Sequence, residues 1–179
     1  MSRTRNRSTD WTKLRHLFKR RDIPARTILL EEGKMAKNLF IIEKGCLRTW
    51  VSNNGRDITT QFFFEGDGVS SIESFMTKTP SPLTIESIEP CVIQSVSQKE
   101  FLSLVERSPE MQQELHGHIF RRLIQCQQSL LSHLKDNPQK RYEDLLKQHP
   151  EIIQRVPQHY IASYLGITAV SLSRIRSRR

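Results

Sequence analysis

Hydrophobic residues between Thr27 and Val96 occur in short runs separated by turn-forming residues, not at helical spacing. The runs are rich in β-branched and aromatic side chains, and the separators include EEG, KG, NNG and EGD. The Asn-Gly pair within VSNNGRDIT indicates a β-hairpin, because both residues tolerate positive φ. Many short strands without intervening helices predict an antiparallel β-barrel or sandwich over residues 27–107.

After Val96 the hydrophobic spacing becomes helical. Ser97 and Glu100 fit an S-x-x-E capping box that opens a short helix, and the sequence SPE at 108–110 fits the start of a second helix. From there, apolar positions recur every three or four residues, which predicts a helix of about seven turns over 108–136. Its apolar stripe comprises Leu115, Ile119, Leu123, Cys126, Leu130 and Leu134. A long helix with a narrow stripe most often pairs with a second copy of itself, so we expect a homodimer; the alternative is packing on the chain's own barrel.

The C-terminal segment has the pattern of a helix-turn-helix. Pro157 is well placed as the first helical residue, Gly166 can adopt the left-handed turn conformation, and Thr168 can cap the second helix. The residues expected to face a shared core are Ile161, Ala162, Leu165, Leu172 and Ile175.

The second helix of this motif has the side chains needed to read DNA. If Leu172 and Ile175 point inward, a rotation of about 100° per residue places Val170, Arg174 and Ser177 on the opposite face. Ser173 lies beside that face, and Arg176 and Arg178 flank it. An exposed arginine can donate two hydrogen bonds to guanine, and flanking arginines reach phosphates, so double-stranded DNA is the expected partner.

The charge distribution agrees with a polyanionic partner. The formal net charge is +9, and it divides into +7 for residues 1–26, −3 for 27–100 and +5 for 101–179. A basic balance alone allows non-specific binding to nucleic acid or to an anionic membrane. The chain has no apolar run of about 18 residues and no hydrophobic signal segment, so we expect a cytoplasmic location without membrane association.

Catalytic and metal chemistry find little support in the sequence. The three cysteines, Cys46, Cys91 and Cys126, form no CxxC pair, so neither a disulfide framework nor a zinc site is expected. A small barrel could house a cupin-like metal enzyme, but such a site needs converging histidines, and no histidine lies between residues 27 and 100. We therefore expect no enzymatic activity and no cofactor.

The order of these parts, with a C-terminal LGITAVSLSRIR, resembles the Crp/Fnr family of bacterial transcription regulators. The resemblance implies an α+β chain: a double-stranded β-helix (jelly-roll) barrel like a cyclic-nucleotide-binding domain, a long dimerisation helix and a helix-turn-helix. It also implies a palindromic DNA site, a small-molecule effector and RNA polymerase as a candidate partner. The helix at 168–178 would be the reader, with Ala169, Val170 and Arg174 at base-contacting positions. The DNA-binding residues are then Thr168, Ala169, Val170, Ser173, Arg174, Arg176, Ser177 and Arg178.

The effector implied by this resemblance does not look like cyclic AMP. Members that bind the nucleotide use a Gly-Glu pair for the ribose and an Arg-Ser/Thr pair for the phosphate. Here Ile72 stands in place of the glycine before Glu73, and Ser81-Pro82 stands in place of the Arg-Ser/Thr pair. No cation lies between Lys78 and Lys99. A buried phosphate without a cation is costly. The effector is therefore unknown, and Glu73, Ser74, Ser81 and Pro82 are its candidate pocket.

The sequence thus predicts four segments. They are a basic N-terminal arm or helix at 1–26, a sensor barrel at 27–107, a dimerisation helix at 108–136 and a DNA-binding domain at 137–179. The alternative function is a sensory protein with the same barrel and dimer helix that does not read specific DNA sequences.

Overall fold

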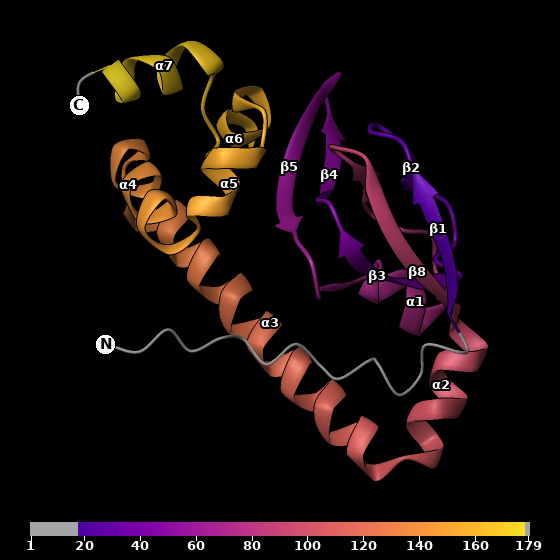
Figure 1. Cartoon of the computed structure of the whole chain (residues 1–179). Helices are drawn as coiled ribbons and strands as arrows, with labels where there is room; N and C mark the ends of the chain where they lie inside the picture. Colours follow the sequence, from indigo (N-terminus) through magenta and orange to yellow (C-terminus); the bar gives the residue numbers. More distant parts are fainter. Residues whose placement is uncertain (1–17, 178–179) are drawn as a thin grey trace. The chain divides into compact units, whose positions relative to one another are not determined.

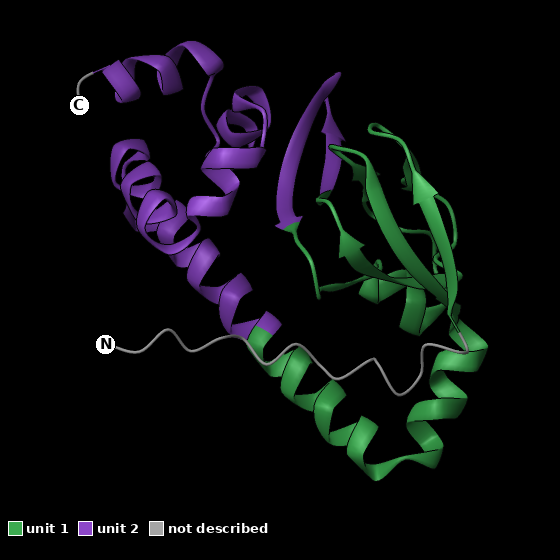
Figure 2. Cartoon of the chain, viewed as in Figure 1, with its two compact units in different colours: residues 1–47, 63–121 green, residues 48–62, 122–179 purple. Residues whose placement is uncertain are grey.

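The computed structural model describes residues 18–177. The predicted phosphate-binding residue Arg178 and most of the predicted basic arm lie outside the described residues. The chain forms two compact units, the first from Met1–Leu47 and Phe63–Arg121, the second from Arg48–Phe62 and Arg122–Arg179 (Figure 2).

The first sheet contains four antiparallel strands in the order β1-β8-β3-β6. Strands β1, β8 and β3 are labelled in Figure 1. Their bounds are Lys19–Ile23 for β1, Cys91–Ser97 for β8, Asn38–Lys44 for β3 and Gly68–Val69 for β6. Strand β1 lies inside the segment predicted as an arm and pairs with β8 from Lys19 opposite Ser95 to Ile23 opposite Cys91. Its first four residues are exposed and only Ile23 is buried, so its charged composition concealed an edge strand.

The second sheet has the order β2-β7-β4-β5. Its strands are β2 (Ile28–Leu30), β7 (Thr84–Ser87), β4 (Leu47–Asn53) and β5 (Arg56–Phe63). Asn54 and Gly55 join β4 to β5 with φ of 51° and 74°, so the predicted hairpin turn is confirmed. The two antiparallel sheets form the predicted jelly-roll-like barrel. The expectation of no intervening helix was wrong at α1 (Ile72–Thr77).

The core of the first unit is apolar, and both sheets and the following helices supply it. It includes Phe40, Ile42, Leu47, Ile85, Ile93, Val96, Phe101 and Met111. The capping box at the start of α2 (Gln98–Arg107) is confirmed: the Glu100 amide donates to Ser97 Oγ at 3.2 Å, and the Ser97 amide donates to the Glu100 carboxylate at 3.2 Å. Helix α3 spans Pro109–Lys135, 27 residues, or about 40 Å.

Four shorter helices follow α3 (Figure 1). They are α4 (Pro138–Gln148), α5 (Pro150–Arg155), α6 (Gln158–Tyr164) and α7 (Ala169–Ser177). Asn137 caps α4, because its side-chain oxygen accepts a hydrogen bond from the Lys140 amide at 2.9 Å. Within residues 18–177, no helix combines the length and apolarity that a membrane crossing requires.

Candidate nucleic-acid interface

Helices α6 and α7 form the predicted helix-turn-helix. Ile161, Ala162 and Leu165 on α6 or at its end are buried, as is Leu172 on α7. Gly166 has φ of 68°, and its amide donates to the Ser163 carbonyl at 3.0 Å, which closes the end of α6 in the predicted left-handed conformation. The prediction that Pro157 is the first helical residue was wrong by one position, because Pro157 precedes the helix, which begins at Gln158.

Helix α7 is capped as predicted and presents one exposed and one buried face. Thr168 Oγ1 accepts a hydrogen bond from the Ser171 amide at 3.1 Å. Leu172 is only 1% exposed and Ile175 is half-buried, so the inward face is the expected one. The predicted contact residues within the described part of the chain are all exposed: Thr168, Ala169, Val170, Ser173, Arg174, Arg176 and Ser177.

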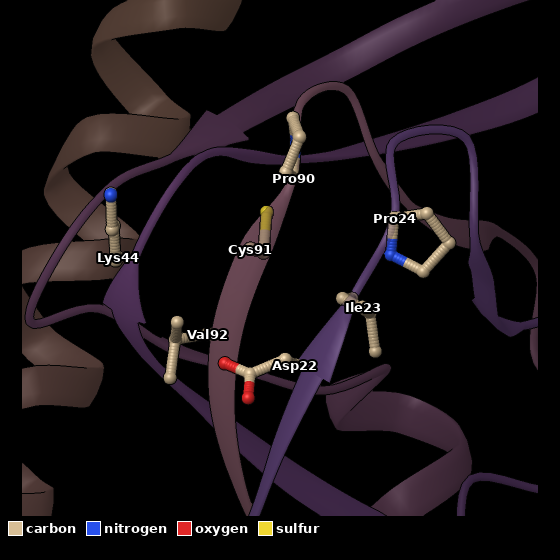
Figure 3. A pocket seen from close by; sticks show the side chains of 7 residues that line it. All are labelled: Asp22, Ile23, Pro24, Lys44, Pro90, Cys91 and Val92. Atoms are coloured by element: carbon tan, nitrogen blue, oxygen red, sulfur yellow. The ribbon is translucent and has the colours of Figure 1, made fainter.

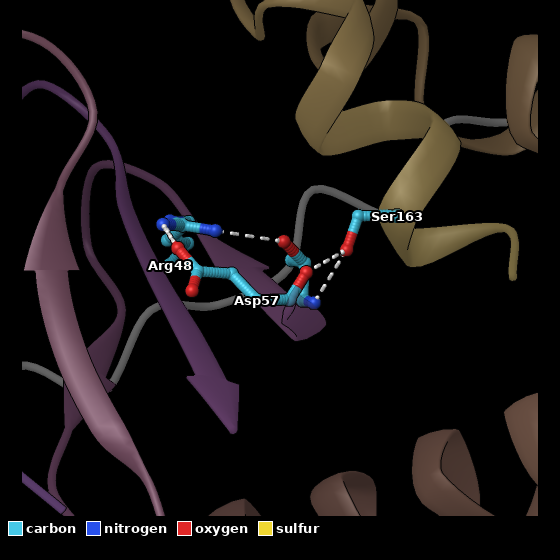
Figure 4. A network of polar contacts seen from close by, with 4 residues as sticks. Arg48, Asp57 and Ser163 are labelled. Carbon is cyan, nitrogen blue, oxygen red and sulfur yellow. Dashed lines mark hydrogen bonds and ion pairs between the residues drawn. The ribbon is translucent and has the colours of Figure 1, made fainter. Parts of the chain in front are cut away.

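The β4–β5 hairpin contacts α6 within the second unit (Figure 4). Ser163 Oγ donates to the Asp57 carbonyl at 2.7 Å and accepts from the Thr59 amide at 2.9 Å. Its hydroxyl therefore binds two main-chain groups of the same strand. We call this contact, together with the Arg48–Tyr160 stack described next, the hairpin clasp.

A buried arginine forms the second half of the hairpin clasp. The guanidinium of Arg48 lies 3.9 Å from the centre of the Tyr160 ring on α6 and 5.1 Å from that of Trp50. It also donates to Thr59 Oγ1 at 3.2 Å and pairs with Asp57 at 3.1 Å, and the whole residue is only 2% exposed. Burial is tolerated because the charge has an ion-pair partner, hydrogen bonds and two aromatic faces.

Two further contacts hold the end of α6. Phe62 on β5 packs against Tyr164 with ring centres 5.3 Å apart, and burial raises the pKa of the Tyr164 phenol. The Arg141 guanidinium on α4 donates to the Leu165 carbonyl at 2.8 Å. Sequence reasoning missed Arg48, Tyr160 and Ser163, since contacts between segments about 110 residues apart leave no periodic signal.

The predicted effector residues do not share one environment. Ser74 is buried and accepts from the Ala36 amide at 2.8 Å, and Ser81 is buried and donates to the Leu83 carbonyl at 2.6 Å. Glu73 and Pro82 are exposed. The structure thus gives both serine hydroxyls partners in the backbone, and the assignment of these residues to an effector pocket stays a prediction.

A hollow of about 260 Å³ lies elsewhere in the first unit, where β1 and β3 end and β8 begins (Figure 3). Its lining consists of Asp22, Ile23, Pro24, Lys44, Pro90, Cys91 and Val92. Burial raises the pKa of the Cys91 thiol, so this cysteine is not an activated nucleophile. Within residues 18–177, no cluster of histidine, cysteine or carboxylate side chains could hold a metal ion.

The predicted stripe on α3 is largely exposed within a single chain. Leu115 packs against the core of the first unit, whereas Leu123 is 62% and Leu130 60% exposed. Further exposed apolar residues widen the stripe: Phe120, Ile124 and Leu131. An apolar surface this continuous is typical of an interaction site.

The structure defines a class of protein: a jelly-roll-like β-barrel followed by a long helix and a C-terminal helix-turn-helix. Residues 20–108 match the cyclic nucleotide-binding domain family. The chain thus contains a domain of the cyclic nucleotide-binding family, and the curated relatives and solved structures similar to it include transcription regulators of the Crp/Fnr family. In the curated cAMP-activated global transcriptional regulator CRP of Pasteurella multocida (strain Pm70), 101 residues are 25% identical, covering 56% of this chain and 48% of that protein. The match thus spans about half the length of that relative.

Solved structures share the fold over most of the chain. The c-di-GMP responsive global regulator CLP of Xanthomonas campestris has a TM-score of 0.76 at 17% identity, covering 93% of this chain and 88% of that one. A transcriptional regulator from Eubacterium rectale assigned to the Crp/Fnr family has a TM-score of 0.74 at 17% identity, covering 95% and 82%. These structures bear out the barrel and the C-terminal helices.

Proposed function

We propose that this protein is a cytoplasmic, homodimeric transcription regulator that reads a palindromic DNA site with the helix at 168–178. Residues 27–107 would sense an effector, 108–136 would dimerise and 137–179 would bind DNA. RNA polymerase is the further partner that such a role implies. The alternative is a sensory protein of the same fold that does not select a DNA sequence.

The observation that carries this proposal is the outward face of α7. Leu172 anchors the helix, so the exposed Arg174 side chain is held on the opposite face. Within residues 18–177, Arg174 has no hydrogen bond or ion pair through its guanidinium. All its donors are therefore available to guanine O6 and N7 in the major groove.

Dimerisation is supported by the exposed apolar face of α3. Two copies of this face would bury side chains that a single chain leaves in water, at about 25 cal/mol per Å². Two reader helices must lie about 34 Å apart to enter successive major grooves. Leu123→Glu should shift the sedimentation coefficient to that of a monomer. Gln125→Glu adds the same charge about 200° around the helix, at an exposed position opposite the apolar face, and should leave the dimer intact. A Leu123→Glu protein that stays dimeric would contradict this interface.

The hairpin clasp supports control through the barrel. Strands β4 and β5 belong to the second sheet and bind α6 directly, so a change in these strands reaches the DNA-binding helices without passing through α3. The effector itself is not identified. Residues 79–98 contain no cation that could pair with the phosphate of cyclic AMP, so we expect cyclic AMP to leave the thermal unfolding midpoint of the protein unchanged. A thermal unfolding midpoint that rises and then saturates as the cyclic AMP concentration increases would contradict this expectation.

The decisive experiment is selection of random duplex DNA by the purified full-length protein. Wild type should enrich a two-fold symmetric site, and Arg174→Ala should lose that enrichment. Arg107→Ala, which removes another exposed arginine from α2, is the matched control and should select the same site as wild type. Uniform recovery of sequences by wild type would favour the alternative of a sensor without sequence-specific DNA binding.

A further inference from the structure

The exposed face of α7 offers few free hydrogen-bonding groups. Thr168 Oγ1 accepts from the Ser171 amide and lies 2.9 Å from Ser171 Oγ, so the helix cap already occupies it. Ser177 Oγ donates to the Arg174 carbonyl at 3.1 Å. Among the described residues of this face, Ser173 and Arg174 are the side chains left to form polar contacts with bases.

The rest of the face is apolar. Val170 is 61% exposed, and Ala169 beside it is also exposed. A single exposed valine is common on protein surfaces and means nothing alone. Here, however, Val170 lies four residues before Arg174 on the same helical face, where the two side chains are neighbours. Its branched side chain is held in one preferred rotamer, so it presents its methyl groups in a fixed position.

Only one group in the major groove matches such a surface. Thymine carries a C5-methyl group, whereas the other base edges present donors and acceptors that an apolar side chain leaves unpaired. Resting on the proposed DNA reading, we propose that Val170 and Ala169 determine specificity by contacting thymine methyl groups next to the guanine bound by Arg174. Four residues of helix rise about 6 Å and a base-pair step rises about 3.4 Å, so the thymine lies within about two base pairs of that guanine.

The test uses two random duplex libraries that differ only in that methyl group. One is amplified with thymidine triphosphate and the other with deoxyuridine triphosphate, which forms the same base pairs but lacks the C5-methyl. The site selected from the first library should contain thymine within two positions of the conserved guanine in each half. Replacing that thymine with uracil should weaken binding about fourfold per half-site, or about fifteenfold for the whole symmetric site. A 5-methylcytosine at the same position should bind more tightly than cytosine.

Variants assign the effect to a side chain. Val170→Ala should bind the thymine and uracil sites with a ratio clearly below that of wild type, because the γ-methyl groups that contact the thymine methyl are gone. Arg107→Ala, at an exposed position of α2 outside the reader helix, should keep the wild-type ratio. The ratio compares the affinities of one protein for two DNAs, so it does not change if part of the Val170→Ala protein is unfolded. The ratio measured with wild type alone already tests the methyl contact.

The outcomes separate this inference from the function on which it rests. A symmetric site that requires Arg174 but binds equally with thymine and uracil would overturn the methyl contact and leave DNA reading intact. A Val170→Ala protein that keeps the wild-type ratio would overturn the assignment to Val170. If neither library yields a symmetric site, the proposed function itself fails.

Discussion

Removing the guanidinium of Arg48 should loosen the attachment of α6 to the hairpin. In Arg48→Met the side chain keeps its apolar stem but loses the contact with the Tyr160 ring at 3.9 Å and the hydrogen bonds to Thr59 and Asp57. A desolvated cation–π contact contributes about 2 kcal/mol, and a hydrogen bond from a charged group about 1.5–3 kcal/mol. The Asp57 side chain is 48% exposed and can be hydrated after the change, which lowers the cost. We expect a loss of about 3 kcal/mol in the free energy of unfolding.

A double-mutant cycle isolates the stacking contact. Urea unfolding of the full chain, followed by the fluorescence of Trp50 beside the arginine, should give an interaction free energy of about 1–2 kcal/mol between Arg48→Met and Tyr160→Leu. Arg56→Met, on an exposed position of the same hairpin, is the matched control and should cost less than about 0.5 kcal/mol. The reasoning is refuted if the cycle gives no interaction, or if Arg48→Met costs no more than the control.

Three further predictions test other features. Gly45→Ala should cost more than about 3 kcal/mol, because its Cβ would lie 2.5 Å from Cys91 Sγ; Gly33→Ala, with positive φ but no neighbour within 4 Å, should cost about 1 kcal/mol in the same urea assay. Hydrogen bonds from Ser97 lower the pKa of Glu100 below its ordinary 4.5, so its contribution to stability is present above that pH and is lost as pH falls through the lowered value. Unfolding measured from pH 3 to 7 should therefore be less pH-dependent in Glu100→Gln, and an identical profile would contradict this. In DNA-binding titrations, Arg176→Ala should reduce the log–log salt slope by about 1.8 per dimer, whereas an unchanged slope would show that Arg176 contacts no phosphate.

Local turn and capping chemistry explains why much of this fold could be predicted. The Asn54-Gly55 turn, the Ser97 capping box and the left-handed Gly166 each require particular residue types at fixed spacing, and the structure has all three. The burial of Leu172 followed from helical periodicity in the same way. These features depend on neighbours within a few residues, so a single sequence carries them.

Features that depend on distant segments could not be predicted in this way. The sequence of strand β1 is mostly charged and therefore suggested a tail. The strand is stabilised by pairing with β8, about 70 residues away, which its own sequence does not reveal. Arg48 lies in a strand whose alternation gives no sign that its charge is buried against Tyr160. Similarly, Ser74 and Ser81 suggested a ligand site by their position, but their hydroxyl groups bind the backbone of the barrel.

The way in which Ser163 attaches α6 has a consequence for how this protein can change over evolution. Both of its partners on β5, the Asp57 carbonyl and the Thr59 amide, are groups that every residue except proline possesses. Exposed side chains of that strand, such as those at positions 56 and 58, can therefore diversify toward new signals without breaking these two hydrogen bonds. The constraint falls instead on position 163, where only serine or threonine offers a hydroxyl of suitable length.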